Sequence, residues 1–227
     1  MLNLTGVVAI IHAKGSSERV QGKNRQLLGD WPLFVHAIRL AQRATMVRHV
    51  VIDSDDEGIL QEGEALGAVP LKRPAELATN KTAGDGLETW AAFNLPSTEM
   101  LVVPMATSPF VKPESIDGAI GLLKGMAERN SVAGVAKKKL FLWEENPEYY
   151  YSRPAYGDKR TTQKMPWTIW ETTGLYVVRT SYVLERFQRI DYENCLPYEL
   201  SQIEAIDIDT PEDLELARAL WRGLNQA

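Results

Sequence analysis

The chain has 227 residues, of which 44% are hydrophobic and 24% charged, and its formal net charge is −5. The high apolar fraction and modest charge exclude an intrinsically disordered chain and suit one large α/β domain. A single cysteine, Cys195, excludes an intrachain disulfide framework and a cysteine-rich zinc site, and it fits a reducing compartment. The 30 acidic against 25 basic residues disfavour general nucleic-acid binding.

Membrane insertion is also disfavoured by the hydropathy pattern. No apolar run approaches the roughly 20 residues that a helix needs to cross a bilayer. The first residues lack the basic segment of a signal peptide, so we expect them to lead directly into the first strand. These features together predict a cytoplasmic protein without membrane or nucleic-acid partners.

Short apolar segments rich in β-branched residues alternate along the chain with amphipathic segments. The first, Gly6 to His12, is apolar almost throughout, which is typical of a strand buried on both faces of a parallel sheet. The same alternation predicts further strands at 47–52, 68–71, 100–104, 131–136, 175–178 and 204–208, and helices at 32–44, 56–66, 84–94, 113–129, 181–189 and 211–224. This order favours right-handed βαβ units and hence an α/β fold, with a mainly parallel sheet covered by helices on both faces.

The alternation is interrupted after residue 137. Nine aromatic residues lie from Phe141 to Tyr176, among prolines and charges and without a helical period. We interpret approximately 139–172 as a small β-rich arm inserted in a single domain that spans 1–227. Such a segment is too small for a core of its own. It is expected to bury its apolar face on a second subunit, giving a homodimer, or on its own domain as a flap.

The loop after the first strand concentrates positive charge. From Lys14 to Arg25 it carries four cations against one acid, Glu18. Ligands bind α/β sheets at the carboxyl ends of their strands, and a loop with Gly and Ser lets backbone amides approach phosphate oxygens. The Walker spacing is absent, because six residues separate Gly15 from Gly22, and there is no GxGxxG pattern. The loop is therefore either an anion-binding loop or a solvated basic turn.

Two aspartates near the other end of the chain point to a metal. In a strand at 204–208, alternation would place the side chains of Asp207 and Asp209 on one face, about 7 Å apart. Two carboxylates beside a cationic loop form a hard oxygen site suited to Mg²⁺. Alternatively, Asp209 or Thr210 caps the helix predicted from Pro211. Both interpretations hold together if Thr210 caps while the aspartates bind the metal.

Four segments in order carry a family resemblance: HAKGSSERVQGKN at 12–24, RPAELA at 73–78, TSP at 107–109 and EAIDIDT at 204–210. They resemble the cytidylyltransferases that activate acidic sugars, particularly the acylneuraminate (CMP-sialic acid synthetase) branch, over nearly the whole chain. The resemblance implies a Rossmann-like nucleotidyltransferase fold with a dimerisation arm. It also implies Mg²⁺-dependent transfer of CMP from CTP to the anomeric hydroxyl of an acidic sugar, with release of pyrophosphate.

The resemblance implies a role for individual residues. Lys14, Lys23 and Asp209 would be catalytic, with the two lysines holding the triphosphate, and Asp207 with Asp209 would hold Mg²⁺. Asn24 and Arg73 would contact the cytosine, with Asp85 near the ribose. The full set of implied CTP-binding residues is Ala13, Gly15, Ser16, Asn24, Arg73, Thr82, Asp85 and Met105.

Departures from the family pattern leave the acceptor open. Met105 and Ala106 stand where the family has Gln-Pro, in the stretch where the sugar acid would bind. The acceptor could be an N-acylneuraminate or related nonulosonic acid, 3-deoxy-octulosonate, or a phosphonate. Residues 137–139, three lysines, are candidates for an acceptor carboxylate or form a solvated turn. A second hypothesis is a nucleotide-binding module without turnover.

Overall fold

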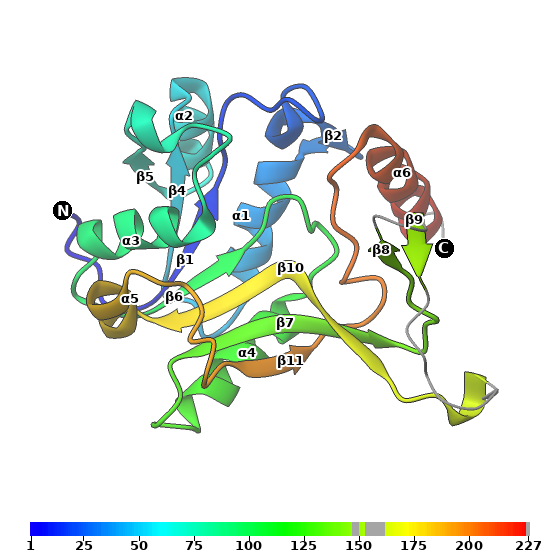
Figure 1. Cartoon of the computed structure of the whole chain (residues 1–227). Helices are drawn as coiled ribbons and strands as arrows, with labels where there is room; N and C mark the ends of the chain where they lie inside the picture. Colours follow the sequence, from blue (N-terminus) through cyan, green and yellow to red (C-terminus); the bar gives the residue numbers. More distant parts are fainter. Residues whose placement is uncertain (147–149, 153–161, 226–227) are drawn as a thin grey trace.

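The computed structural model describes residues 1–146, 150–152 and 162–225. The strands of its central sheet are β1 (Gly6–His12), β4 (His49–Ser54), β5 (Val69–Lys72), β6 (Thr98–Pro104), β7 (Ser131–Lys138), β10 (Thr168–Arg179) and β11 (Leu196–Glu199). They lie in the order β11-β7-β10-β6-β1-β4-β5 (Figure 1). All neighbours pair in parallel except β10, which is antiparallel to both β6 and β7.

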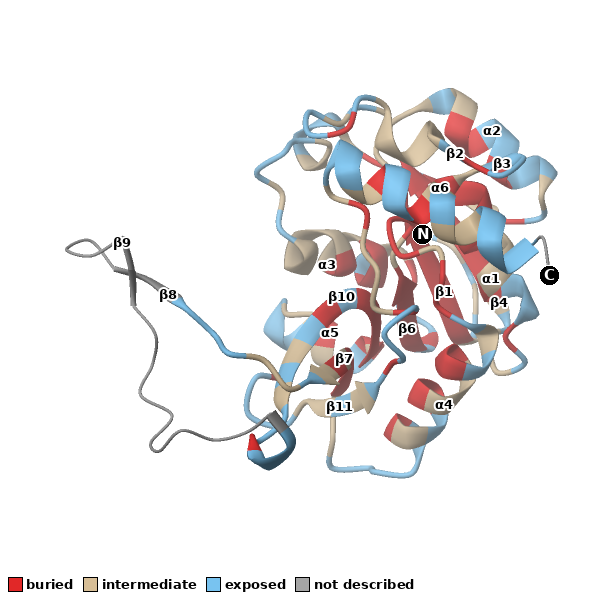
Figure 2. Ribbon diagram, turned by 90° about the vertical axis from the view of Figure 1, so that its right-hand side faces the viewer, coloured by how far each residue is buried: buried red, intermediate tan, exposed pale blue. Residues whose placement is uncertain are grey.

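Helices cover both faces of this sheet, as the alternating pattern predicted. The helices on one face are α1 (Leu33–Arg43), α2 (Glu57–Ala65) and α4 (Pro113–Lys124), and those on the other are α3 (Gly84–Asn94) and α5 (Thr180–Arg186). Strand β1 shows why: Val7, Ala9 and Ile11 join the first core, whereas Val8 and Ile10 join the second. A strand with two buried faces needs apolar residues at every position, and Figure 2 shows β1 buried along its length.

The last helix, α6 (Pro211–Asn225), lies outside these two layers. It packs against the short strands β2 (Leu27–Leu28) and β3 (Trp31–Pro32), which form a hairpin after the basic loop. Val20, Leu28, Ile208 and Leu214 share one apolar cluster there. This cluster ties the start of α6 to the basic loop, although about 180 residues of chain separate them.

The strand predicted at 204–208 is wrong. The edge strand is β11 instead, and Glu204 follows it in a turn. Glu204 is 5% exposed, and its carboxylate accepts hydrogen bonds from the backbone N–H groups of Lys112 and Ser201 and from the hydroxyls of Ser115 and Ser201. Burial raises the pKa of Glu204, but these hydrogen bonds outweigh it and leave the pKa below its usual value. These hydrogen bonds hold Glu204 in a turn, so the chain leaves the sheet at this point.

The arm is described in part. Its described strands are β8 (Glu144–Asn146) and β9 (Tyr150–Ser152), which pair antiparallel, while 147–149 and 153–161 lie outside the described residues. The exposed segment before β8 leaves the body of the domain (Figure 2). Trp143, Trp167 and Ile169 are each more than half exposed. The homodimer stays a prediction.

Two further boundaries differ from the sequence pattern. Helix α4 ends at Lys124, before Gly125, rather than at Arg129. Strand β10 begins at Thr168 and thus includes the end of the predicted arm. In the described part of the chain, no helix combines the length and apolar composition that spanning a bilayer requires.

Candidate active site

Two adjoining cavities lie at the carboxyl ends of β1 and β6, where ligands bind sheets of this kind. The loop-side cavity, about 450 Å³, is lined by the basic loop together with Arg73 and residues 77–82. The aspartate-side cavity, about 330 Å³, is lined by Asp207, Asp209, Glu88 and Arg189, among others. Among the described residues, those that line both cavities are His12, Arg19, Lys23, Thr82, Leu87 and Met105.

Most of the predicted site residues line these cavities. The loop-side cavity includes Lys14, Ser16, Lys23, Asn24, Arg73, Thr82 and Met105, and the aspartate-side cavity includes Lys23, Thr82, Met105, Asp207 and Asp209. Three predicted residues do not line either cavity. Ala13 is fully buried, Gly15 donates its N–H to Asp55, and the Asp85 carboxylate accepts the N–H of Arg189.

The basic loop is held in shape by its own hydrogen bonds. Asn24 Nδ2 donates to the Lys14 carbonyl at 2.8 Å, so Asn24 closes the loop on itself. Gly15 sits so close to Asp56 that a Cβ there would lie 2.8 Å from the Asp56 side chain. Lys14 Nζ donates to the Asn80 side chain across the loop-side cavity. Three of the four cations of the loop, Lys14, Arg19 and Lys23, line a cavity, whereas Arg25 pairs with Asp56 and Glu62. This arrangement favours anion binding over a solvated turn.

Lys23 and Asp209 join the two ends of the chain. Lys23 Nζ lies 2.9 Å from Asp209 Oδ1 and donates to the Ile208 carbonyl at 3.0 Å, and the Lys23 side chain is only 13% exposed. Arg19 contacts the other carboxylate oxygen of Asp209 at 2.9 Å. Burial raises the pKa of Asp209, but these two cations outweigh it and lower the pKa below its usual value. Asp209 is therefore ionised at neutral pH.

The two aspartates share a cavity without belonging to a strand. Buried Ile208 packs in the apolar cluster beside α6, and its N–H donates to the Thr107 carbonyl. Asp207 accepts hydrogen bonds from the hydroxyls of Ser108 at 3.3 Å and Thr173 at 3.1 Å. The predicted carboxylate pair is thus present, but an apolar anchor and not strand alternation brings it to the site.

Thr210 caps α6, so neither Asp207 nor Asp209 serves as the cap. The Thr210 hydroxyl accepts the N–H of Asp213 at 3.2 Å, and the Asp213 carboxylate accepts the N–H groups of Asp209 and Thr210. This reciprocal arrangement is a capping box. The carboxylates of Asp207 and Asp209 therefore satisfy no helix terminus.

The donor set fits Mg²⁺ in the manner that this ion prefers. Among the described residues, no three His, Cys, Asp or Glu side chains gather as a metal cluster. Mg²⁺ is commonly held by one or two carboxylates, with waters and substrate phosphates completing its shell. Asp207 and Asp209 supply that pair beside the loop-side cavity, which is lined by cations.

A buried ionic group beneath the cavities was not predicted. His12 Nδ1 donates to Asp53 Oδ2 at 2.6 Å, and Arg73 Nη2 contacts the same oxygen at 2.6 Å. Burial lowers the pKa of His12, but the hydrogen bonds and charges of Asp53 and Glu88 outweigh it and raise the pKa above 6.5. The sequence shows polar residues near the ends of two apolar segments, but only the register of β1 with β4 pairs His12 with Asp53.

Arg189 is the second functional side chain that the sequence did not reveal. Its guanidinium lies 3.8 Å from the ring centre of Tyr176, and its Nη1 lies 3.4 Å from Glu88 Oε1. The Tyr176 hydroxyl donates to Glu171, and burial together with that carboxylate raises the pKa of Tyr176. Arg189 is thus a positioned cation in the aspartate-side cavity.

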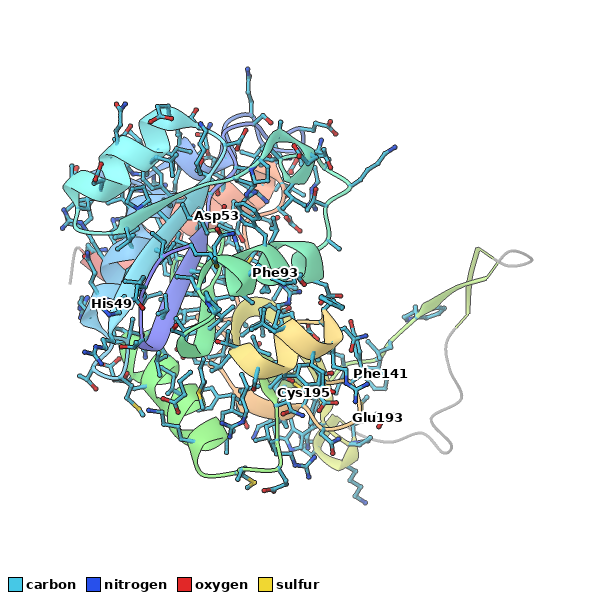
Figure 3. The ribbon with its side chains drawn as sticks, turned by 90° about the vertical axis from the view of Figure 1, so that its left-hand side faces the viewer. His49, Asp53, Phe93, Phe141, Glu193 and Cys195 are labelled. Carbon is cyan, nitrogen blue, oxygen red and sulfur yellow. The ribbon has the colours of Figure 1, made fainter. Side chains whose placement is uncertain are left out.

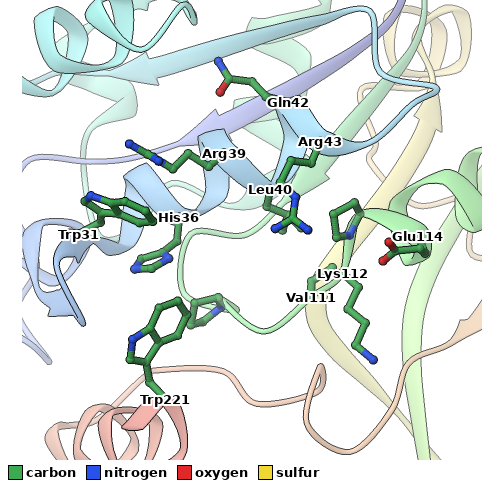
Figure 4. A pocket seen from close by; sticks show the side chains of 12 residues that line it. Trp31, His36, Arg39, Leu40, Gln42, Arg43, Val111, Lys112, Glu114 and Trp221 are labelled. Atoms are coloured by element: carbon green, nitrogen blue, oxygen red, sulfur yellow. The ribbon is translucent and has the colours of Figure 1, made fainter. Parts of the chain in front are cut away.

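Other candidate positions lie away from these cavities. A cavity of about 620 Å³ between α1 and α6, seen in Figure 4 with Trp31, Arg39 and Trp221 around it, has no described lining residue in common with them. Figure 3 shows His49 at the other end of β4 from Asp53. Lys137 pairs with Glu199 at 2.6 Å and Lys139 donates to the Gln163 carbonyl at 2.5 Å, so these lysines face β11 and the arm.

The chain was compared with known proteins. A family model described as cytidylyltransferase matches residues 8–225. A CMP-N,N'-diacetyllegionaminic acid synthase of Legionella pneumophila is 28% identical over 97% of each chain. A 3-deoxy-manno-octulosonate cytidylyltransferase of Anaeromyxobacter dehalogenans is 29% identical over 94% of this chain and 97% of that one.

A solved structure agrees in fold. A CMP:2-keto-3-deoxy-manno-octonic acid synthetase complexed with CTP has a TM-score of 0.72 at 16% identity, covering 96% of this chain and 99% of that chain. The match covers nearly the whole of both chains, and it confirms the predicted nucleotidyltransferase fold. With the family match over nearly the full length, the chain belongs to the cytidylyltransferase family and is a nucleotidyltransferase.

Proposed function

We propose that the chain transfers CMP from CTP to the anomeric hydroxyl of an acidic sugar, with Mg²⁺, and releases pyrophosphate. The observation that carries the proposal is the ion pair between Lys23, which lines both cavities, and Asp209, which lines the aspartate-side cavity. One cavity is then available for the nucleotide and the other for the acceptor, and the cation and carboxylate stand where the two substrates would meet.

The loop-side cavity suits a nucleoside triphosphate. Lys14, Arg19, Lys23 and Arg73 line it, against the single acid Glu18. A triphosphate carries several negative charges, and cations in a recess lined by backbone and side-chain donors attract and orient it. Of these residues, Lys14, Lys23 and Arg73 are those that the family resemblance assigns to CTP.

Catalysis in this site would come from positioning and charge neutralisation. The acceptor hydroxyl gives up its proton to a carboxylate of the site or to water, its oxygen forms a new bond to the α-phosphorus of CTP, and the bond from that phosphorus to pyrophosphate breaks. Lys14 and Lys23 offset the charge that gathers on the α-phosphate and on the leaving group. Mg²⁺, held by Asp207 and Asp209, would supply further positive charge at the phosphate oxygens.

The aspartate-side cavity suits an anionic acceptor. Arg189 lines it as a cation that a substrate carboxylate could contact, and Thr173 and Tyr176 add polar surface. Similar relatives act on a nonulosonic acid and on an octulosonate, at nearly equal identity. We therefore propose a 2-keto sugar acid, either an N-acylneuraminate-type nonulosonic acid or 3-deoxy-octulosonate, as the acceptor.

A pyrophosphate-release assay tests the proposal. The purified chain is incubated with Mg²⁺ and CTP across N-acylneuraminates, legionaminate-type acids, 3-deoxy-octulosonate and small phosphonates, with ATP, GTP and UTP as controls. We expect release with CTP and with a sugar acid. Release with a phosphonate alone would show that the acceptor is not a sugar acid. The absence of CTP binding would overturn the proposal.

The homodimer and the cytoplasmic location belong to the same proposal. The exposed Trp143, Trp167 and Ile169 give the arm an apolar surface for a second copy. Sedimentation of the chain at micromolar concentration tests this part, with a dimer expected. Monomers alone would contradict it.

A further inference from the structure

A line of five charged side chains crosses beneath both cavities in the order Arg73, Asp53, His12, Glu88, Arg189. Asp53 and Glu88 are fully buried, and His12 and Arg73 are 9% and 4% exposed. They come from separate elements: β4, β1, α3 and the segments after β5 and α5. Arg73 lines the loop-side cavity, Glu88 and Arg189 line the aspartate-side cavity, and His12 lines both.

Both ring nitrogens of His12 face carboxylates. Nδ1 lies 2.6 Å from Asp53 Oδ2, and Nε2 lies 3.6 Å from Glu88 Oε1. A neutral imidazole has one N–H and one lone pair, so one carboxylate would face that lone pair. Only the imidazolium presents a hydrogen to each carboxylate, in a hydrogen bond to Asp53 and in a longer charge contact to Glu88, because Nε2 has no hydrogen-bond partner among the described residues. The raised pKa of His12 agrees with this geometry.

The two carboxylates that face His12 are not held equally firmly by other residues. Asp53 also receives Nε and Nη2 of Arg73, at 3.0 and 2.6 Å, so its position does not depend on His12 alone. Glu88 has the longer contacts to His12 and to Arg189, both on Oε1, and its Oε2 has no hydrogen-bond partner among the described residues. Loss of the Nε2 proton would therefore disturb Glu88 and Arg189, and leave Asp53 and Arg73 in place.

We propose that His12, as an imidazolium, is a positioning residue that holds Glu88 and, through it, the Arg189 guanidinium in the aspartate-side cavity, and so controls acceptor binding rather than CTP binding. The proposal rests on the proposed function, in which that cavity takes the acceptor. The ionisable groups around His12 are Asp53 from β4, Arg73 after β5, Glu88 from α3, Arg189 after α5, Tyr176 with Glu171 from β10, and Arg19, Lys23, Asp207 and Asp209 in the shared or adjoining walls.

The kinetic test separates the two substrates. In H12N the amide can still donate toward Asp53, but the cation facing Glu88 is lost. We expect the KM for the acceptor to rise about tenfold, as for the loss of one buried charge contact, with the KM for CTP within about twofold. E88Q removes the carboxylate through which His12 acts on Arg189, so we expect it to raise the acceptor KM as well, and H12N/E88Q to raise it no further than the larger of the two single effects. H49N, at the far end of β4, is the control and is expected to match the wild type.

The pH dependence of the two KM values in the wild-type enzyme gives the same distinction between acceptor and CTP without a variant. As pH rises through the titration of His12, the acceptor KM should rise while the CTP KM stays level. Equal changes in both KM values, or additive effects of H12N and E88Q on the acceptor KM, would overturn the proposal.

An NMR titration of the His12 ring in the full chain does not require turnover. We expect its midpoint above the ordinary 6.5 of histidine and lowered in E88Q. A midpoint at or below 6.5, or one unchanged by E88Q, would overturn the proposal. If no sugar acid is turned over, the proposed function fails, and this titration alone decides whether His12 is the imidazolium described.

Discussion

Replacement of Lys23 by methionine removes the cation in the shared wall while keeping most of the side-chain volume. The Lys23 ammonium is largely shielded from water and stands 2.9 Å from Asp209. At about 3 Å and an effective dielectric constant of about 20, one charge pair is worth roughly 5 kcal/mol before desolvation is subtracted. Loss of a preorganised donor to a developing negative charge costs about 3–4 kcal/mol of transition-state stabilisation, or 10²–10³-fold in rate.

Steady-state pyrophosphate release measures this loss. We expect kcat/KM for CTP to fall 10²–10³-fold in K23M and less in K23R, because arginine keeps the charge and changes its geometry. The matched control is K124M, since Lys124 is an exposed residue of α4 that contacts Glu99 at 3.6 Å. A K23M enzyme within about threefold of the wild type would refute the reasoning.

Three further substitutions or titrations test other parts of the account. D209A should abolish Mg²⁺-dependent turnover while CTP still binds, as measured by calorimetry; retained turnover would remove Asp209 from the site. I10A should lower the free energy of unfolding by about 2–5 kcal/mol in urea, because Ile10 is fully buried in β1, and a loss below 1 kcal/mol would contradict the core described. The contribution of His12 to the free energy of unfolding should be fully present below pH 6.5 and lost as pH rises through its raised pKa, and urea unfolding of H12N should lack this alkaline loss. The contributions of Asp53 and Glu204 should be lost as pH falls through their lowered pKa values.

The layered fold was predictable because its signal is local. A strand buried on both faces must be apolar at each position, and β1 is, so its place in a parallel sheet follows from seven residues. Helix boundaries were close where a cap or proline marks them, as at Asp56 before α2 and Pro113 in α4. The edge strand β11 was missed because Pro197 interrupts its pattern, and proline is tolerated in an edge strand.

The site was predictable in its residues more than in its geometry. The cations of the basic loop and the pair Asp207 and Asp209 could be found from charge and motif. Their meeting depends on Ile208, whose burial beside α6 is a tertiary contact that no strand period encodes. The ionic line through His12 and Glu88 was out of reach, because it requires the register of β1 with β4 and the position of α3 above them.

The central claim is that the acceptor oxygen bonds to the α-phosphorus of CTP. The most direct measurement is mass spectrometry of the product formed from CTP and a 2-keto sugar acid labelled with ¹⁸O at its anomeric hydroxyl. The account predicts one CMP-sugar per pyrophosphate released, with the label retained in the bridging C–O–P oxygen. Release of pyrophosphate with unlabelled CMP as the only nucleotide product, or with the label lost from the sugar, would contradict it.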